Sequence, residues 1–220
     1  MNNLAQARFD SVAETSDIDF TKLSDIDLYR RVPEGTRKSQ VLGDSNWQSQ
    51  IDSLARSFPD MARTTLALSV LGVYFCRISE DQEVVFKLVN GVVPTQAGIE
   101  SVVQLGIEAR EAFAAFASRV AVQQSISLVS AAAHNYYNRE SASDLVVSMG
   151  SLPADGIEAD IHFHILENGQ IDIRTASYIE PEYAERIYSR VLTLAGDIAN
   201  NHFSSLAFHE IMSPVERNTV

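Results

Sequence analysis

An Asn-Gly dipeptide, Asn168–Gly169, constrains the fold of this chain more than any other local feature. It separates two strand-length segments, ADIHFHIL (Ala159–Leu166) and QIDIRTAS (Gln170–Ser177), in which apolar and polar residues largely alternate. Asn and Gly tolerate the positive φ that a two-residue hairpin turn requires, so these segments are predicted to form a hairpin. A third segment, DLVVSMG (Asp144–Gly150), has the length and composition of a strand. We therefore predict that the three strands share one sheet.

Helical periodicity predicts most of the remaining elements. Apolar residues recur at every third or fourth position in five stretches, as expected for helices with a buried face. The predicted helices span about residues 46–57, 60–76, 98–120, 122–137 and 181–201, and one further strand spans Glu83–Asn90. The chain is thus predicted to be an α/β protein in which helices cover a small mixed sheet. No glycine-rich phosphate-binding motif is present, so nucleotide binding is not predicted.

Composition and charge argue against several classes of function. The 220 residues carry a formal charge of −12, which disfavours binding to nucleic acid or to an anionic membrane. The longest apolar run, Leu66–Phe75, is much shorter than the roughly 20 residues of a membrane-spanning helix. The N-terminus lacks the apolar core of a signal peptide, and the single cysteine, Cys76, cannot form an internal disulfide. We expect a cytoplasmic protein in which Cys76 is a small buried hydrophobe.

The first 43 residues differ from the rest of the chain. Pro33 and Gly35 interrupt them, and acidic residues outnumber basic ones between residues 1 and 30. We expect residues 1–43 to form a flexible acidic arm and residues 44–220 to form the folded lobe. The arm contains more apolar residues than a solvated tail needs, so it is either such a tail or a docking segment that orders on a partner.

His162 and His164 are the candidate residues for acid–base chemistry. They lie two positions apart on a predicted strand, so both imidazoles are expected on one face of the sheet. A metal site would need a third ligand that no recognisable spacing supplies. A nucleophilic Ser148 is a further possibility because catalytic triads are spatial, but no G-x-S-x-G motif surrounds this serine. We favour a hydrogen-bonded sheet face, and we assign no catalytic, cofactor-binding or metal-binding residue.

Five collinear segments carry a family resemblance. TTLALSVLGVYFCRISEDQEVVFKLVNG (Thr64–Gly91) and SVVQLGIEAREAFAAFASRV (Ser101–Val120) are followed by DLVVSMGSLP (Asp144–Pro153), by Ala159–Asn201 and by SPVERNTV (Ser213–Val220). In this order they resemble a helix and strand, a long helix, a "VSNLG" strand, a closing hairpin with its helix, and an exit segment of the type "LSPEERQ". These are features of the C-terminal lobe of condensation domains from nonribosomal peptide synthetases. The resemblance implies a single chloramphenicol-acetyltransferase-like lobe.

The sequence also departs from this family. A complete condensation domain has two such lobes, and the HHxxxDG motif that carries its catalytic histidine lies in the N-terminal lobe. This chain has the length of one lobe and contains no His-His pair. It also passes from Gly91 to the predicted helix at Ser101 in a few residues, where the family inserts a longer loop that bridges the lobes. We therefore expect that the bridge is lost and that this chain does not catalyse amide formation alone.

The resemblance implies a structural role for the truncated domain. We expect a platform or docking element for an adjoining adenylation domain, a peptidyl carrier domain or both, in the same polypeptide. No cofactor is expected on the chain itself, although a partner carrier domain would bear phosphopantetheine. The candidate interface residues are four apolar positions near the C-terminus: Phe203, Leu206, Phe208 and Ile211. Alternatively, these side chains pack onto their own lobe.

Two other functions remain open. In the first, the chain is a half-domain that assembles with a second copy or a separate lobe into an acyltransferase. This enzyme would act on pantetheinyl thioesters, with His162 or His164 as acid or base. Alternatively, the chain is a free-standing adaptor with no synthetase attached.

Overall fold

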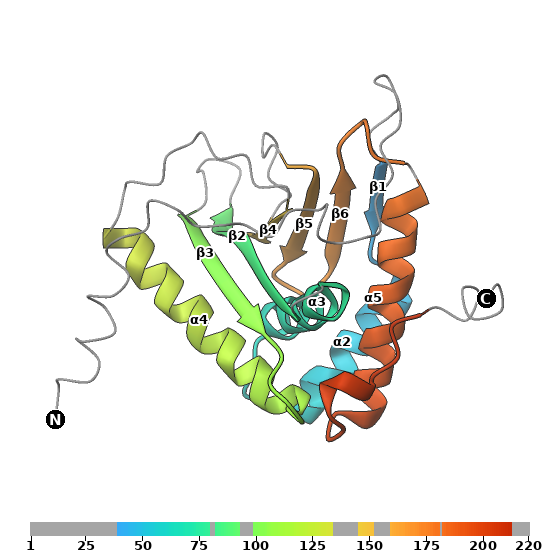
Figure 1. The fold of residues 1–220 in the computed structure, drawn as a ribbon. Helices are drawn as coiled ribbons and strands as arrows, with labels where there is room; N and C mark the ends of the chain where they lie inside the picture. The colour runs from blue at the N-terminus through green and yellow to red at the C-terminus, as the bar shows by residue number, and fades with distance from the viewer. Residues whose placement is uncertain are drawn as a thin grey trace, which may run out of the picture.

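A six-stranded mixed sheet organises the chain in the computed structural model (Figure 1). The structure describes residues 39–79, 82–92, 99–133, 145–151, 159–180 and 182–212. Across the sheet the strands are β1 (Ser39–Leu42), β6 (Ile171–Thr175), β5 (Ile161–Leu166), β4 (Leu145–Gly150), β2 (Glu83–Val92) and β3 (Ile99–Gly106). β4 pairs in parallel with both β2 and β5, and the other neighbours are antiparallel. The predicted α/β class and mixed sheet are confirmed.

The helices pack together around α3 (Arg63–Ile78), which lies against the middle of the sheet (Figure 1). The others are α2 (Ser45–Ser57), α4 (Phe113–Ala133) and α5 (Glu182–Asn201). The carboxylate of Asp44 starts α2 because it accepts hydrogen bonds from the backbone N–H groups of Asn46, at 2.9 Å, and Trp47, at 3.1 Å. In the described part of the chain, no helix has the length and apolar character needed to span a bilayer.

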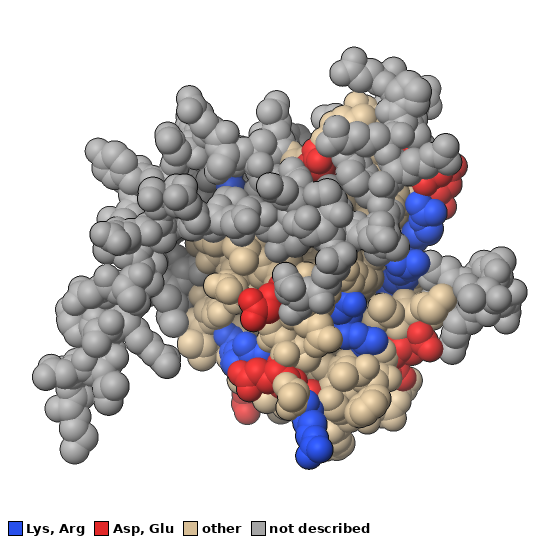
Figure 2. Space-filling view, viewed as in Figure 1, with Lys and Arg blue, Asp and Glu red and all other residues tan. Residues whose placement is uncertain are grey.

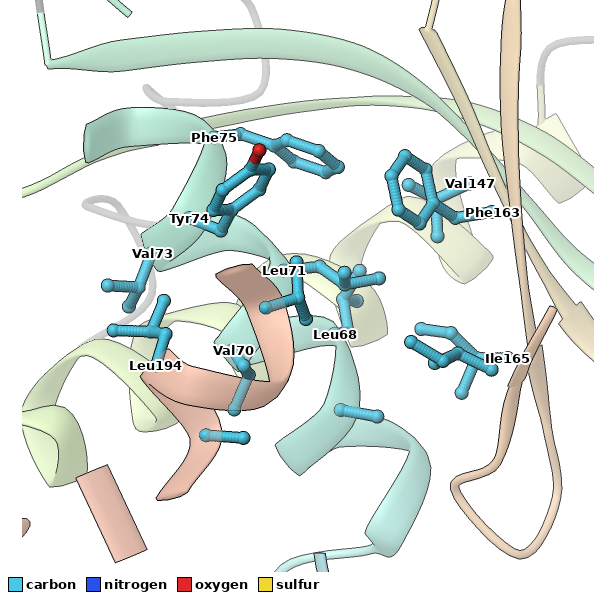
Figure 3. Packing of buried hydrophobic residues seen from close by; sticks show 14 of the residues in the cluster. Leu68, Val70, Leu71, Val73, Tyr74, Phe75, Val147, Phe163, Ile165 and Leu194 are labelled. Atoms are coloured by element: carbon cyan, nitrogen blue, oxygen red, sulfur yellow. The ribbon is translucent and has the colours of Figure 1, made fainter. Parts of the chain in front are cut away.

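The core lies between α3 and the sheet (Figure 3). Phe75 on α3 meets Phe163 on β5 edge to face, with 5.1 Å between ring centroids. Leu194 of α5 packs on the other side of α3, close to Val73 (Figure 3). Cys76 belongs to the same cluster, and burial raises the pKa of its thiol to about 12. This thiol is therefore protonated at neutral pH, in keeping with the small hydrophobe that the sequence predicts.

The predicted hairpin at Asn168–Gly169 is confirmed, since β5 and β6 pair antiparallel around it. Gly169 has a φ of +84°, which side chains other than glycine rarely allow. A Cβ at this position would also lie 3.0 Å from the Cβ of Arg63 and 3.2 Å from its carbonyl oxygen. Trp47 donates its indole N–H to the Gly169 carbonyl at 2.8 Å, so the turn is fastened to α2.

The helix predicted over residues 98–120 is wrong at its start. Ile99–Gly106 forms β3, which pairs antiparallel along β2, and a single helix, α4, replaces the two predicted between 98 and 137. Val103 and Leu105 face the core while Gln104 is exposed, which is the alternation of a strand with one buried side. The resemblance of Ser101–Val120 to one long helix fails for the same reason. The expected loss of a lobe bridge therefore has no basis, since it relied on a helix at Ser101.

The arm assigned to residues 1–43 ends inside the sheet. Ser39–Leu42 forms the edge strand β1 on β6, and Gly43 donates its backbone N–H to the Ile171 carbonyl at 2.7 Å. The folded lobe thus includes residues 39–43 of the predicted arm. Residues 1–38, the predicted helix end at 134–137 and the exit segment 213–220 lie outside the described residues.

Candidate functional site

A row of polar side chains lies on the face of the sheet that points away from α3. Ile161, Phe163 and Ile165 of β5 point into the helix-covered core, so the residues between them lie on the opposite face. The row comes from four neighbouring strands and consists of Gln40, Ser148, His162, His164, Asp172 and Arg174. The prediction that His162 and His164 share one face is therefore correct.

Ser148 joins the two histidines. Its Oγ lies 2.6 Å from Nε2 of His162 and 2.6 Å from Nδ1 of His164, and the exposed fractions of these three residues are 0%, 4% and 0%. Strand pairing explains the contact, because Ser148 on β4 lies directly beside His164 on β5. A hydroxyl carries one proton, so Ser148 donates to one imidazole and accepts from the other. The two histidine tautomers are thereby coupled.

Both histidines are neutral at physiological pH. Burial, followed by electrostatic repulsion of a protonated His162 from Arg174 and from any proton on His164, lowers the pKa of His162 from its ordinary 6.5 to about 4. Burial also lowers the pKa of His164, although the neighbouring Asp172 carboxylate opposes this effect. His164 Nε2 is buried and has no hydrogen-bond partner within the described residues.

Asp172 and Arg174 extend the polar row along β6. Arg174 donates from Nε to Oδ2 of Asp172 at 2.9 Å, and Gln40 of β1 donates to both carboxylate oxygens at 3.0 Å. Asp172 is fully buried, so these bonds compensate its loss of hydration. Gln40, Asp172 and Arg174 were not predicted from the sequence as members of a site. The hairpin turn could have revealed two of them, because it sets Asp172 opposite His164 and Arg174 opposite His162.

This cluster fits a buried hydrogen-bonded network better than a catalytic centre. A histidine whose pKa is about 4 is a poor general base at neutral pH. Within the described ranges, no group of three or more His, Cys, Asp or Glu side chains could hold a metal ion. The sheet-face interpretation is thus favoured for Ser148, His162 and His164.

The candidate interface residues near the C-terminus divide into two groups. Phe203 and Phe208 are the most exposed large apolar residues of the described chain, at 88% and 84%. Leu206 is wholly buried in the core of its own lobe, and Ile211 is partly buried against that core. The side chain of Leu206 therefore packs into the core of its own lobe and exposes no surface to a partner.

The segment that carries Phe203 and Phe208 is held firmly to the lobe. Arg77 at the end of α3 donates to the carbonyls of Leu206, at 2.9 Å, and His209, at 2.7 Å. Leu206 donates its backbone N–H to the Glu111 carbonyl at 2.8 Å, which places the segment beside the start of α4 (Figure 1). His209 Nδ1 also contacts Oδ2 of Asp197 on α5 at 2.7 Å. These bonds fix the backbone between the two exposed rings.

No family model and no curated protein matches this sequence. Solved structures nevertheless share its fold. The X-domain in complex with OxyB from teicoplanin biosynthesis matches with a TM-score of 0.64 at 10% identity, over 94% of this chain and 55% of that chain. The starter condensation domain of rhizomide synthetase matches with a TM-score of 0.63 at 12% identity, over 94% and 55%.

A larger protein contains the same fold. A four-domain nonribosomal peptide synthetase bound to AMP and glycine matches with a TM-score of 0.65 at 13% identity, over 91% of this chain and 20% of that chain. Against the X-domain and condensation-domain structures, the chain spans only about half of their length, 55% in both matches described above. The chain therefore has the fold of a partial condensation domain, a single condensation-like lobe.

Proposed function

We propose that this condensation-like lobe is a docking platform for an adenylation domain of a nonribosomal peptide synthetase, and that it does not itself catalyse amide formation. The observation that carries the proposal is the exposure of Phe203 and Phe208 on one anchored segment. Exposed aromatic residues are costly in water and are typical anchors of protein interfaces. Because Arg77 and Asp197 already hold the segment, little ordering entropy is lost when a partner covers these rings.

The mixed charges on the surface of the lobe support a docking contact that is mainly apolar. On the face in Figure 2, acidic and basic side chains are interspersed over the visible described residues, without a broad patch of one sign. An interface built on such a surface depends on apolar burial at its centre more than on long-range attraction. Two phenylalanines, only five positions apart in sequence, can form such a centre.

The similar structures support a role in a larger assembly. One is an X-domain in complex with another protein, OxyB, and another is a four-domain synthetase. This chain contains no His-His pair. It therefore lacks the motif on which amide formation depends in the family that it resembles. In this proposal a peptidyl carrier domain, with its phosphopantetheine, is bound elsewhere in the assembly and not by Phe208.

Replacing Phe208 with Asp should weaken binding of the adenylation domain at least about tenfold, because a charge would be buried at the centre of the interface. The lobe should remain folded, since Phe208 is 84% exposed. Calorimetric titration of the separately expressed adenylation domain would measure the change. Val122→Asp is the matched control, because Val122 on α4 is also apolar and is 58% exposed. Unchanged affinity in Phe208→Asp, or an equal loss in Val122→Asp, would refute the proposal.

One atom of the Ser148 cluster supports a second candidate function. His164 Nε2 is a buried polar atom without a partner among the described residues, and a substrate could satisfy it if a second lobe completed a tunnel. This is the half-domain acyltransferase, in which His162 or His164 handles the proton. Acyl transfer from a pantetheinyl thioester that a His162→Ala, His164→Ala double variant abolishes would support it. We rank this candidate second because of the low pKa of His162.

A further inference from the structure

A groove of about 630 Å³ lies between α2 and the start of α3, remote in sequence from the Ser148 cluster and from Phe208. All its lining side chains are polar or charged: Ser45, Gln48, Ser49, Asp52, Arg56 and Arg63. The five from α2 recur at positions i, i+3, i+4, i+7 and i+11, so they form one stripe of that helix. Neither the proposed docking platform nor the sequence motifs involve this groove.

Asp52 accepts a hydrogen bond from each of the two arginines that line the groove. Arg63 donates from Nε to the Asp52 carboxylate at 2.9 Å, and Arg56 donates from Nε to the Asp52 backbone carbonyl at 3.3 Å. Both guanidinium groups are thus oriented through Nε on the same residue. Their terminal amino groups make no hydrogen bond to any residue that the structure describes. The terminal amino groups of both arginines are therefore available to a ligand in the groove.

The charges in the groove do not cancel. Arg56 and Arg63 contribute two positive charges and Asp52 one negative charge, so the groove is cationic in a chain whose formal charge is −12. Guanidinium groups bind oxyanions through paired N–H donors. The hydroxyl of Ser49, three residues before Asp52 on the same stripe, adds a further donor. A carboxylate has two oxygens for this set of donors, whereas a phosphoryl group has three or four and a tetrahedral shape.

We propose that the groove between α2 and α3 is an oxyanion site, in which Arg56 and Arg63 bind a phosphoryl group and Ser49 completes its hydrogen bonds. Asp52 is a positioning residue, since it orients both arginines while its charge lowers their affinity for an anion. The site does not depend on the docking platform, so either can fail without the other.

Titration with inorganic phosphate at constant ionic strength tests this site. The arginine Nε–Hε signals and the α2 amides would be followed by NMR in the whole chain. We expect saturable binding in the millimolar range and a loss of at least about tenfold in the Arg56→Gln, Arg63→Gln double variant. Arg186→Gln is the matched control, because Arg186 also forms an exposed ion pair, with side-chain exposure of 47% against 49% for Arg63. It should leave phosphate affinity unchanged.

The phosphate affinity of the Asp52→Asn variant distinguishes an anion-binding site from an ordinary surface ion pair. This variant keeps an oxygen for Arg63 and the carbonyl for Arg56 but removes the negative charge, so phosphate should bind about threefold more tightly.

Dimethyl phosphate and acetate are two further probes. If dimethyl phosphate also binds, the site accepts a diester such as a pantetheinyl arm, and if only inorganic phosphate binds, it accepts a terminal phosphate. Absence of saturation, equal affinity in the double-arginine variant, unchanged affinity in Asp52→Asn, or equally tight binding of acetate would overturn the proposal.

Discussion

The free energy of unfolding should fall by about 3 kcal/mol as the pH decreases from 7 to 4. The pKa of His162 is about 4 in the folded lobe against 6.5 ordinarily, so the unfolded chain binds the proton first. The stabilisation is fully present above pH 6.5 and is lost as the pH falls toward 4, where the folded lobe also takes up the proton. The size follows from about 1.4 kcal/mol for each pKa unit of difference. His164 acts in the same direction because its pKa is also lowered.

Carboxylates contribute to the pH dependence of the free energy of unfolding mainly below this pH window. The pKa values of Asp44, Asp52 and Asp197 lie below 3.8, so the stabilisation that they provide is present above 3.8 and is lost as the pH falls further. The histidine effect can therefore be isolated by urea unfolding at several pH values between 7 and 4.

Matched variants assign the effect to its residues. His162→Gln and His164→Asn place an amide near the ring nitrogen that contacts Ser148, and neither side chain titrates in this range. The double variant should lose most of the pH dependence between 7 and 4, whatever its stability at pH 7. A slope that matches the wild-type slope would show that these histidines are not the neutral, buried groups described above.

Phe163→Ala should destabilise the lobe by about 4 kcal/mol. Phe163 is fully buried on β5 and its ring packs edge to face on Phe75, so truncation leaves a cavity in the core between the sheet and α3. Such a loss is a large part of the 5–15 kcal/mol that typically stabilises a domain. Chemical unfolding at pH 7.5 measures it directly.

Phe208→Ala is the matched control, because it removes the same atoms from a ring that is 84% exposed. Its effect on stability should stay within about 0.5 kcal/mol. Similar losses in the two variants would mean that Phe208 packs against its own lobe and would weaken the case for a docking surface.

The sequence predicts the elements that depend on turn residues, apolar periodicity or a helix cap. The Asn168–Gly169 turn appears where the sequence predicted it, because few residues allow the φ of +84° at Gly169. α5 spans Glu182–Asn201, as its stripe of buried apolar residues indicated. α2 begins directly after its Asp44 cap.

Long-range strand pairing determines β1 and β3, the two strands that were not predicted from the sequence. The apolar positions of Ile99–Gly106 fit a helix as well as a strand, and pairing with β2 selects the strand. β1 has only four residues and depends on β6 for all its backbone partners in the sheet. Neither pairing leaves a periodic signal long enough to recognise in the sequence.

The same limit applies to the Ser148 cluster. Alternation along one strand placed His162 and His164 on a common face, which required no knowledge of neighbouring strands. The contact with Ser148 depends on the parallel register of β4 and β5, which are joined by a connection and not by a tight turn. The oxyanion groove likewise combines α2 with the first residue of α3, so its arginines are adjacent only in the folded lobe.

Hydrogen–deuterium exchange with and without the adenylation domain tests the docking platform most directly. At saturating partner concentration, we predict added protection in residues 202–212, around Phe203 and Phe208, and no change in the β5–β6 hairpin. This segment is already held by Arg77, so the added protection should appear mainly in its exposed amides. Protection confined to another surface, or no change in residues 202–212 when the complex is formed, would contradict the proposed function.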